Sequence, residues 1–369
     1  MVRDTVRMFV TEKVIPFADR HFEDATFPMD LIPAMAALGM YGANLPEEYG
    51  CAGLNNVAYG LIMQELERGD SGLRSFASVQ SGLVMYPIHA FGDEEQRSKW
   101  LPALAKGKVI GCFGLTEADF GSNPGGMLTT ARLDGNEYVI NGSKMWITNG
   151  VTSGVAIVWA KLDGEVNGFI MERERKGFTT KGTHYKLSMR ASATAELFFD
   201  EVRIPKSNRL PKAKGLKAAL SCLTQARYGI AWGAIGSGMA CLHEAIEYSK
   251  DRIMFDKPIA AFQLTQKKLA DMATELTLAQ LLCLQLGRLK DEDRLTPAMV
   301  SLAKRNNVRK ALEIARTART ILGANGIVGE YQSMRHSCNL ESVDTYEGTY
   351  EIHTLVVGDE LTGIPAYHG

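Results

Sequence analysis

The residues best suited to chemistry form a short stretch near the C-terminus, Asp344-Thr345-Tyr346-Glu347-Gly348-Thr349, between two apolar-periodic segments. Gly348 leaves backbone room for a ligand to approach the Glu347 carboxylate, and Thr349 is a typical N-cap for a helix over residues 352–361. A partly desolvated Glu347 would have a raised pKa and could take a proton from a weakly acidic C–H near neutral pH. The alternative is a first-turn acid favoured only by the helix dipole.

Two clusters near expected strands could also contact a ligand. The segment 113–117 (Phe-Gly-Leu-Thr-Glu), followed by Gly121-Ser122, offers hydroxyls and free backbone groups, or it is simply a turn. Trp146-Ile147-Thr148-Asn149 follows Asn141-Gly142, a dipeptide typical of a hairpin turn. An indole and a hydroxyl at a strand end can cover a planar ring and hydrogen-bond its edge, whereas the alternative is an aromatic residue in the core.

Two further clusters flank expected helices. Asp251-Arg252 with Phe255, Gln263 and Gln266 places a cation and two amides around a helix start, which suits either a phosphate or a solvated helix end. The segment 322–326 (Leu-Gly-Ala-Asn-Gly) ends a helix in a glycine-rich turn, and as a helix C-cap it needs no ligand.

Apolar periodicity divides the chain that must position these residues into three units. Helical spacing dominates roughly the first 110 residues. From about Phe113, short runs at 138–142, 155–160, 168–171 and 196–199 predict strands of a small antiparallel β-barrel or sandwich that ends near Pro205. Helical spacing returns at 216–249, 263–289, 297–322 and 351–361, which is typical of an up-and-down bundle. We therefore expect an α+β fold that is mostly α: an all-α domain over 1–112, a β domain over 113–208 and a four-helix bundle over 209–369.

Composition narrows the class of protein. A net charge of -1 over 369 residues provides no bulk field for nucleic acid or anionic membrane, and no apolar run is long enough for membrane insertion. The six cysteines include no C-x-x-C pair, which suits free thiols in a reducing compartment, and no metal site is expected. The chain opens directly into an amphipathic pattern without a helix cap or leader, and a truncated N-terminus is one interpretation of this pattern.

Taken together, these clusters resemble the acyl-CoA dehydrogenase family over nearly the whole chain, from Glu48-Tyr49-Gly50 to the C-terminal helix. Within the family, four segments are most similar to the glutaryl-CoA dehydrogenase subgroup: 71–75 (Ser-Gly-Leu-Arg-Ser), 190–194 (Arg-Ala-Ser-Ala-Thr), 226–232 (Ala-Arg-Tyr-Gly-Ile-Ala-Trp) and 345–349 (Thr-Tyr-Glu-Gly-Thr). The resemblance implies an FAD enzyme and a homotetramer, or dimer of dimers. It also implies an acyl-CoA substrate and an electron-transfer flavoprotein as acceptor, in a bacterial cytoplasm or, if a leader has been removed, a mitochondrial matrix.

The resemblance also assigns roles to individual residues. Glu347 would be the base that removes the α-proton while a hydride leaves the β-carbon for the flavin. The implied FAD contacts, several of them across a subunit interface, are Phe113, Leu115, Thr116, Ser122, Trp146, Ile147, Thr148, Arg252, Phe255, Gln263, Leu322, Gly323, Ala324, Thr349 and Glu351. The implied substrate contacts are Glu67, Arg74, Ser75, Ser78, Ser122, Thr224, Arg227, Tyr346 and Gly348, with Arg227 near the CoA moiety.

Arg74 would select the substrate in this interpretation. A guanidinium in an apolar acyl pocket is costly unless paired, and a distal carboxylate would pair with it bidentately. We therefore expect oxidation of glutaryl-CoA, with decarboxylation to crotonyl-CoA helped by Glu67 and Tyr346, in the catabolism of lysine, tryptophan or aromatic compounds. A salt bridge from Arg74 to Asp70 or Glu67 is the structural alternative.

The chain departs from the family pattern at Gly323-Ala324, where the family has paired glycines, and at 120–123 (Phe-Gly-Ser-Asn), where it has Ser-Gly-Ser-Asp. Three other functions remain open: an oxidase that uses oxygen directly, a dehydrogenase for another carboxylated or short-chain acyl-CoA, and a family member without catalysis that acts as a scaffold.

Overall fold

The computed structural model describes residues 1–366, and its first part is helical, as the sequence predicts. The N-terminal helices, including one π-helical stretch, are α1 (Val2–Lys13), α2 (Ala18–Glu23), α3 (Ile32–Ala37), α4 (Asn56–Gly69), α5 (Ser71–Ser78), η4 (Val79–Met85), α6 (Tyr86–Phe91) and α7 (Glu94–Ala105). Asp93 caps α7 by accepting the Gln96 N–H at 2.9 Å. Asp70 ends α4 and caps α5 through the Gly72 N–H at 2.7 Å, so these two helices form one tight corner.

The middle part is one eight-stranded sheet. Its strands are β1 (Gly111–Gly114), β2 (Thr130–Asp134), β3 (Glu137–Thr148), β4 (Val155–Leu162), β5 (Glu165–Glu172), β6 (Phe178–Gly182), β7 (Thr194–Pro205) and β8 (Arg209–Lys214). The order is β6-β7-β3-β2-β4-β5-β8, with β1 paired to β4. The four predicted strands correspond to β3, β4, β5 and β7, and the sheet continues past Pro205 into β8.

The sheet curls around its own core. The rings of Tyr138 on β3 and Phe169 on β5 lie 5.2 Å apart, although β2 and β4 separate these strands in the sheet. Alternate β4 residues face this inner core and the helices, which explains why the run 155–160 is apolar throughout. The expectation of a purely antiparallel sheet was wrong, because β1 and β2 both pair with β4 in parallel.

The predicted hairpin turn at Asn141-Gly142 was also wrong. β3 continues through both residues with a bulge opposite β7, and the β2–β3 turn lies at Gly135-Asn136 instead. The Asn141 side chain accepts the Glu201 N–H at 2.9 Å, and Gly142 has a φ of 140°. An Asn-Gly pair suits either feature, and the pairing with β7 selects the bulge.

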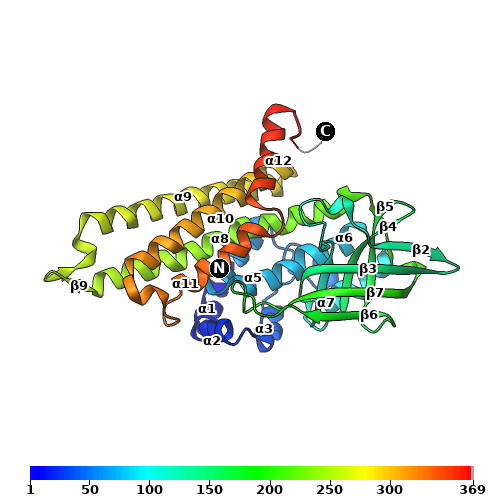
Figure 1. Cartoon of the computed structure of the whole chain (residues 1–369), viewed down its shortest axis with the longest axis horizontal. Coiled ribbons are helices and arrows are strands. Elements are labelled where there is room, and N and C mark those ends of the chain that lie inside the picture. Colours follow the sequence, from blue (N-terminus) through cyan, green and yellow to red (C-terminus); the bar gives the residue numbers. More distant parts are fainter. Residues whose placement is uncertain (367–369) are drawn as a thin grey trace.

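The C-terminal part consists of α8 (Leu216–Asp251), α9 (Gln263–Asp291), α10 (Pro297–Ile321), α11 (Ser333–Thr345) and α12 (Tyr350–Thr362), with the small ribbon β9 (Ile253–Met254) and β10 (Lys257–Pro258). The last helix predicted for the bundle was 351–361, but α11 packs beside α10 and α8, whereas α12 projects from the body (Figure 1). Only His353 of α12 is buried. The sequence pattern therefore missed one bundle helix and put a projecting helix in its place.

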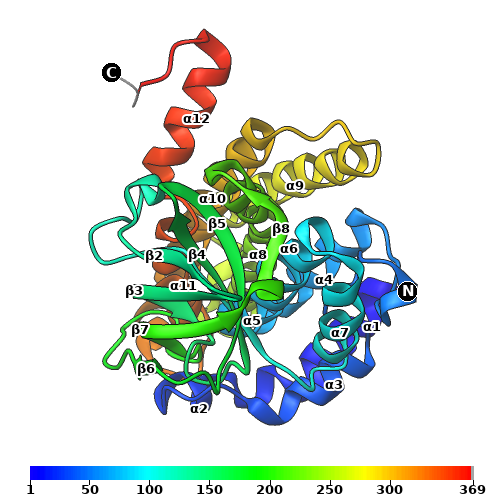
Figure 2. The ribbon, with the colours of Figure 1, turned by 90° about the vertical axis from the view of Figure 1, so that its right-hand side faces the viewer.

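The two ends of the bundle have different surroundings. Figures 1 and 2 show the sheet beside one end of α8 and the N-terminal helices along one side, and Figure 1 shows β9 at the opposite end. The loop before α12 therefore lies where helices of the N-terminal and C-terminal parts meet near the sheet. Within residues 1–366, no helix combines the length and apolar character needed to cross a membrane, and no three His, Cys, Asp or Glu side chains are grouped for a metal.

Candidate active site

The loop between α11 and α12 holds Glu347 in a conformation that its own side chain does not favour. Glu347 has a φ of 52° and Gly348 a φ of 98°. A Cβ at position 348 would lie 2.8 Å from His353 Nε2, so this position requires glycine. Thr349 accepts the Ile352 N–H at 3.2 Å, which confirms it as the N-cap of α12. The loop is thus fixed on both sides of Glu347.

The Glu347 carboxylate is placed as a base requires. Its Oε2 atom is buried and has no hydrogen-bond partner among residues 1–366. Burial raises the pKa of Glu347, and the charges of Arg74, Arg227 and Lys304 oppose that rise. Arg227, expected near CoA, donates from Nε to the Glu347 carbonyl at 2.6 Å, so it contacts the loop backbone. A carboxylate with a free buried oxygen can accept a proton from a ligand.

Arg74 lies fully buried at the α4–α5 corner and has two protein partners. Its Nε donates to Glu67 Oε2 at 2.5 Å, and its Nη2 donates to the Tyr346 hydroxyl. Ser71 donates to the other Glu67 oxygen at 3.0 Å. No hydrogen bond to Arg74 Nη1 is found within residues 1–366. The structure thus joins Glu67, Arg74 and Tyr346 in one cluster and leaves one guanidinium nitrogen for a ligand.

Two hydroxyls beside this cluster are buried without a partner in the described chain. They belong to Ser78 on α5 and Tyr59 on α4. The charges of Arg74 and Glu347 both act on the Tyr59 hydroxyl, whose pKa burial raises. Ser75 is buried on the same helix as Ser78. Orphaned polar atoms grouped around a buried arginine and a buried carboxylate indicate a site built for a polar ligand.

The residues expected to hold the flavin ring lie on β1, on the segment that follows it and on the second half of β3, which this segment contacts. Phe113 lies on β1, the Leu115 carbonyl accepts from Lys144 Nζ at 3.0 Å, and the Thr116 carbonyl accepts the Met145 N–H at 2.9 Å. Trp146 is 57% exposed with a φ of 63°, next to buried Ile147 and half-buried Thr148. Ser122 lies in an exposed bend. An exposed indole held by a bulged strand fits a planar ring that would cover it.

A second group of expected flavin residues lies at the other end of the bundle. Arg252, Phe255 and Gln263 occupy the α8–α9 connection beside β9, and Phe255 is 84% exposed. Arg252 also lines a hollow together with Asn325 and Tyr331. Leu322 is buried, and Gly323 and Ala324 are exposed in η8 (Gly323–Ile327). Two other expected contacts belong to neither flavin group: Glu351 is exposed in α12, and Thr224, expected to contact the substrate, is half-buried on α8. Within one chain, Arg252 and Phe255 do not meet Glu347.

Three contributors escaped the reasoning from sequence. Lys304 on α10 is fully buried and donates to the loop that carries Glu347, and Tyr59 offers a free hydroxyl. Lys144 donates to Glu117 at 2.9 Å, and Glu117 in turn accepts the Thr129 N–H, which shapes the turn after β1. One signal was available for Lys304: it occupies the apolar register of α10, four residues from both Val300 and Val308.

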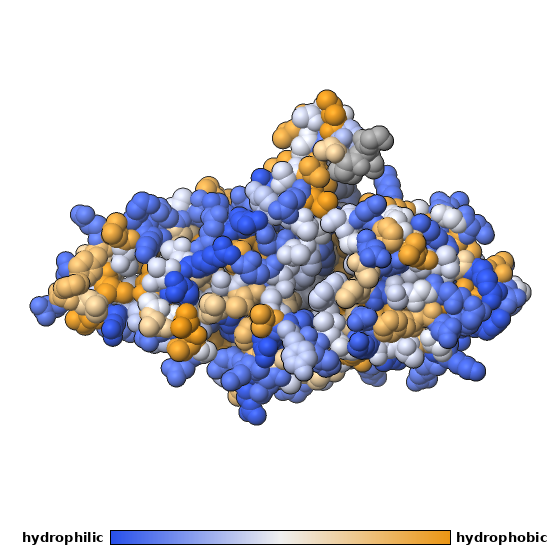
Figure 3. Space-filling model, in the orientation of Figure 1, coloured by the Kyte–Doolittle hydropathy of each residue, from blue (hydrophilic) through white to orange (hydrophobic). Residues whose placement is uncertain are grey.

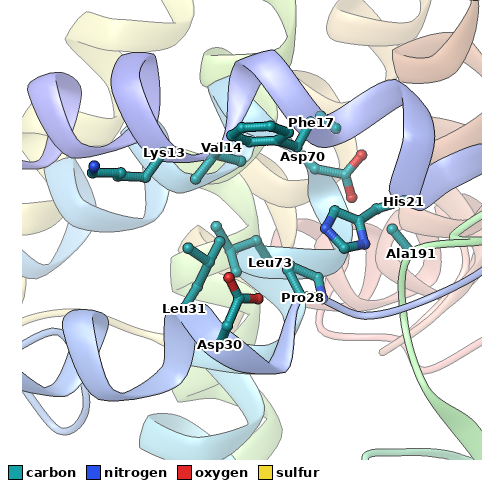
Figure 4. A pocket seen from close by; sticks show the side chains of 11 residues that line it. Lys13, Val14, Phe17, His21, Pro28, Asp30, Leu31, Asp70, Leu73 and Ala191 are labelled. Atoms are coloured by element: carbon teal, nitrogen blue, oxygen red, sulfur yellow. The ribbon is translucent and has the colours of Figure 1, made fainter.

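A separate hollow of about 310 Å³ lies among the N-terminal helices (Figure 4). Its apolar wall includes Val14, Phe17 and Leu73, with Lys13 and Asp30 at the rim. Glu347 and Arg74 do not line it. The hollow is therefore distinct from the cluster described above.

Known proteins that are similar to this chain in sequence or structure include acyl-CoA dehydrogenases. The bovine mitochondrial short-chain specific acyl-CoA dehydrogenase is 36% identical over 367 residues, covering 98% of this chain and 89% of the relative. The crystal structure of a glutaryl-CoA dehydrogenase from Mycobacterium smegmatis in complex with FADH2 is 52% identical with a TM-score of 0.98, covering 100% of this chain and 95% of that one. A glutaryl-CoA dehydrogenase in complex with glutaryl-CoA is 34% identical with a TM-score of 0.95, covering 100% and 96%.

Family models match in the order of the three structural parts. The acyl-CoA dehydrogenase N-terminal domain matches residues 1–108, the middle domain 112–202 and the C-terminal domain 213–362. The resemblance seen in the sequence is thereby confirmed. The chain belongs to the acyl-CoA dehydrogenase family, and FAD is its cofactor.

Proposed function

We propose that this protein catalyses the FAD-dependent α,β-dehydrogenation of glutaryl-CoA. The observation that carries the proposal is Arg74, a buried guanidinium whose hydrogen bonds within residues 1–366 come from Nε and Nη2, in the same polar cluster as the free Glu347 oxygen. An acyl chain whose α-carbon lay at Glu347 would direct a distal carboxylate toward Arg74. The likeness to glutaryl-CoA dehydrogenases of known structure supports this substrate.

The chain supplies a base and an oxyanion donor for the first step. Glu347 removes the α-proton through its unpartnered Oε2, since a raised pKa makes it a better proton acceptor. The Glu347 N–H makes no hydrogen bond within residues 1–366, so it can donate to the thioester carbonyl as negative charge develops there. FAD, when bound beside Trp146 and Thr148, supplies a hydride acceptor for the β-carbon.

The pairing around Arg74 supports the loss of CO2 as a second step of the proposed reaction. A substrate carboxylate held fully by Arg74 would resist C–C cleavage, because ground-state pairing is lost in the transition state. Glu67 and Tyr346 already occupy two of the guanidinium nitrogens, which weakens that grip. After dehydrogenation, cleavage of the bond to the distal carboxylate releases CO2 and leaves its electron pair in a dienolate that is conjugated with the thioester carbonyl. Protonated Glu347 can then return its proton to the terminal carbon. We therefore assign crotonyl-CoA and CO2 as products.

A short-chain acyl-CoA is the second candidate. The Arg74–Glu67 pair neutralises the guanidinium without any substrate carboxylate, and the bovine relative is specific for short chains. The test is incubation with carboxyl-labelled glutaryl-CoA and an artificial electron acceptor. We expect about one labelled CO2 per turnover. Glutaconyl-CoA without released label would refute decarboxylation, and oxidation of butyryl-CoA alone would favour the second candidate.

We also propose a homo-oligomer, for which a tetramer is the family expectation. The distal flavin group at Arg252 and Phe255 would complete the site of a second copy. Figure 3 shows apolar side chains on projecting α12, where Leu361 is 80% exposed, and such surface favours association. Electron-transfer flavoprotein is the proposed acceptor. Sedimentation with and without FAD tests the assembly, and a monomeric flavoprotein would refute it.

A further inference from the structure

Lys304 donates three hydrogen bonds to the segment that carries Glu347. Its ammonium group, buried within α10, donates to the carbonyl oxygens of Asp344 at 3.2 Å, Tyr346 at 3.1 Å and Gly348 at 2.8 Å. An ammonium group has three N–H donors, so all three are used by this one loop. The three accepting residues alternate along the chain and bracket Glu347 on both sides.

The loop needs such a partner for two reasons. Glu347 adopts a positive φ, which costs a non-glycine residue free energy unless the surroundings enforce it. Three carbonyl oxygens that converge on one point also repel each other unless a cation lies between them. Arg227 donates to the carbonyl of Glu347 itself at 2.6 Å. The carbonyls of Asp344, Tyr346, Glu347 and Gly348 are therefore held by two cations, the buried Lys304 of α10 and the half-buried Arg227 of α8.

Burying an ammonium group is expensive, and the cost must be offset by the contacts it makes. Desolvation lowers the pKa of Lys304 to about 7, although the charges of Asp344 and Glu347 oppose this effect. A lysine that served only packing would be replaced without loss by an apolar side chain. The position of Lys304 beneath the base is consistent with a functional reason for its charge.

We propose that Lys304 is a positioning residue for catalysis: it clamps the backbone on both sides of Glu347 and so fixes the carboxylate against the substrate α-carbon. This inference rests on the proposed function only in taking Glu347 as the base. The clamp also adds a positive charge beside that carboxylate, which favours its ionised form. The other charged or titratable groups that face Lys304 are Asp344 with its partner Arg309, Arg227, Arg74, Glu351 and His353.

The test compares three flavin-loaded variants with the wild type. Lys304→Met removes the charge and the donors. Lys304→Arg keeps the charge but replaces the tetrahedral ammonium group by a planar guanidinium group. Lys186→Met is the matched control. Lys186 is a half-buried lysine that also holds a loop, through the carbonyls of Met189 and Ser192 at 2.8 and 2.6 Å, but that loop does not carry Glu347. Anaerobic flavin bleaching by substrate gives the rate, and its pH profile gives the ionisation of the base.

We expect Lys304→Met to lower kcat by roughly 10- to 100-fold with a smaller change in KM, because a displacement of about 1 Å at the reacting group can cost that much. The acid limb of its pH profile for flavin bleaching should move to higher pH, because the positive charge that favours ionised Glu347 is gone. Lys304→Arg should keep the wild-type acid limb but remain several-fold slower, and Lys186→Met should bleach at the wild-type rate. In a Glu347→Gln background, Lys304→Met should have little further effect, because the clamp acts through the base.

A wild-type rate and acid limb in Lys304→Met would overturn the proposal, as would an equal loss in Lys186→Met. If Lys304→Met does not fold, Lys304→Arg decides: a wild-type rate there would show that the geometry of the clamp is irrelevant. Hydrogen exchange of the amides of residues 344–349 provides a readout without turnover, and we expect faster exchange in Lys304→Met only. A wild-type protein that oxidises no acyl-CoA would instead refute the proposed function.

Discussion

Replacing Arg74 by methionine separates the two candidate substrates. The substitution removes a fully buried guanidinium and leaves the Glu67 carboxylate with Ser71 as its remaining partner among those described. Glutaryl-CoA would then bury its distal carboxylate without a cation. Breaking a buried pair from one side costs about 3–5 kcal/mol. Since each ~1.4 kcal/mol is a factor of ten, kcat/KM for glutaryl-CoA should fall by roughly 10²- to 4 × 10³-fold. Butyryl-CoA has no distal carboxylate that could be left unpaired, so its kcat/KM should fall far less.

Part of that loss would come from repulsion by Glu67 rather than from the missing attraction. The double variant Arg74→Met with Glu67→Gln removes both charges and keeps the pocket neutral. We expect it to recover protein stability and to oxidise butyryl-CoA well, while glutaryl-CoA remains a poor substrate. The difference between the single and double variants measures the repulsive part.

Arg335→Met is the matched control for loss of a buried arginine. Arg335 donates to Asp70 at 2.7 Å and lies in the same region, but it belongs to α11 and contacts the corner of α4 and α5 rather than Glu67 or Tyr346. It should lower the melting temperature without changing the ratio of kcat/KM values for the two substrates. Steady-state kinetics with both substrates, below the melting temperature of every variant, provide the comparison. Equal losses for glutaryl-CoA and butyryl-CoA in Arg74→Met would show that Arg74 is structural.

Three further outcomes are expected from the loop itself. Glu347→Gln should bind FAD and acyl-CoA but bleach the flavin at least ~10²-fold more slowly, and a wild-type rate would exclude Glu347 as the base. In the wild type, burial raises the pKa of Glu347, so the acid limb of kcat/KM should lie above pH 4.5. Between that ordinary value and the raised pKa the folded state holds a proton that the unfolded state has lost, so this group's contribution to stability falls as pH rises through the window. Gly348→Ala should impair both stability and bleaching, because its Cβ meets His353 Nε2 and Arg227 Nη2 at 2.8 and 3.3 Å, and a normal melting temperature would contradict this clash.

Local patterns in the sequence determined the family, the three structural parts and the cap of the final helix. Thr349 could be predicted as an N-cap because capping depends on residues that adjoin it in the chain. The strands at 155–160 and 196–199 could be predicted because their apolar or aromatic runs are short and bounded by turn residues. The candidate base was recognised for the same reason, as a carboxylate beside a glycine between two helical segments.

Tertiary contacts decided what those patterns could not express. Helix α11 was missed because its buried positions are largely polar: Arg335 pairs with Asp70, and Asn339 donates to the same carboxylate at 3.0 Å. Burial achieved by polar pairing leaves no apolar periodicity to read. Asn141-Gly142 became a bulge because β7 pairs beside it.

The same limit applies to the site. A sequence shows that a lysine occupies position 304, but only the packing of α10 against the loop shows that its charge is buried under three carbonyl oxygens. Likewise, Arg74 pairs with Glu67 and also with Tyr346, which lies 272 positions further along the chain. Electrostatic free energies depend on distance and desolvation, and both are fixed by the fold rather than by the order of residues.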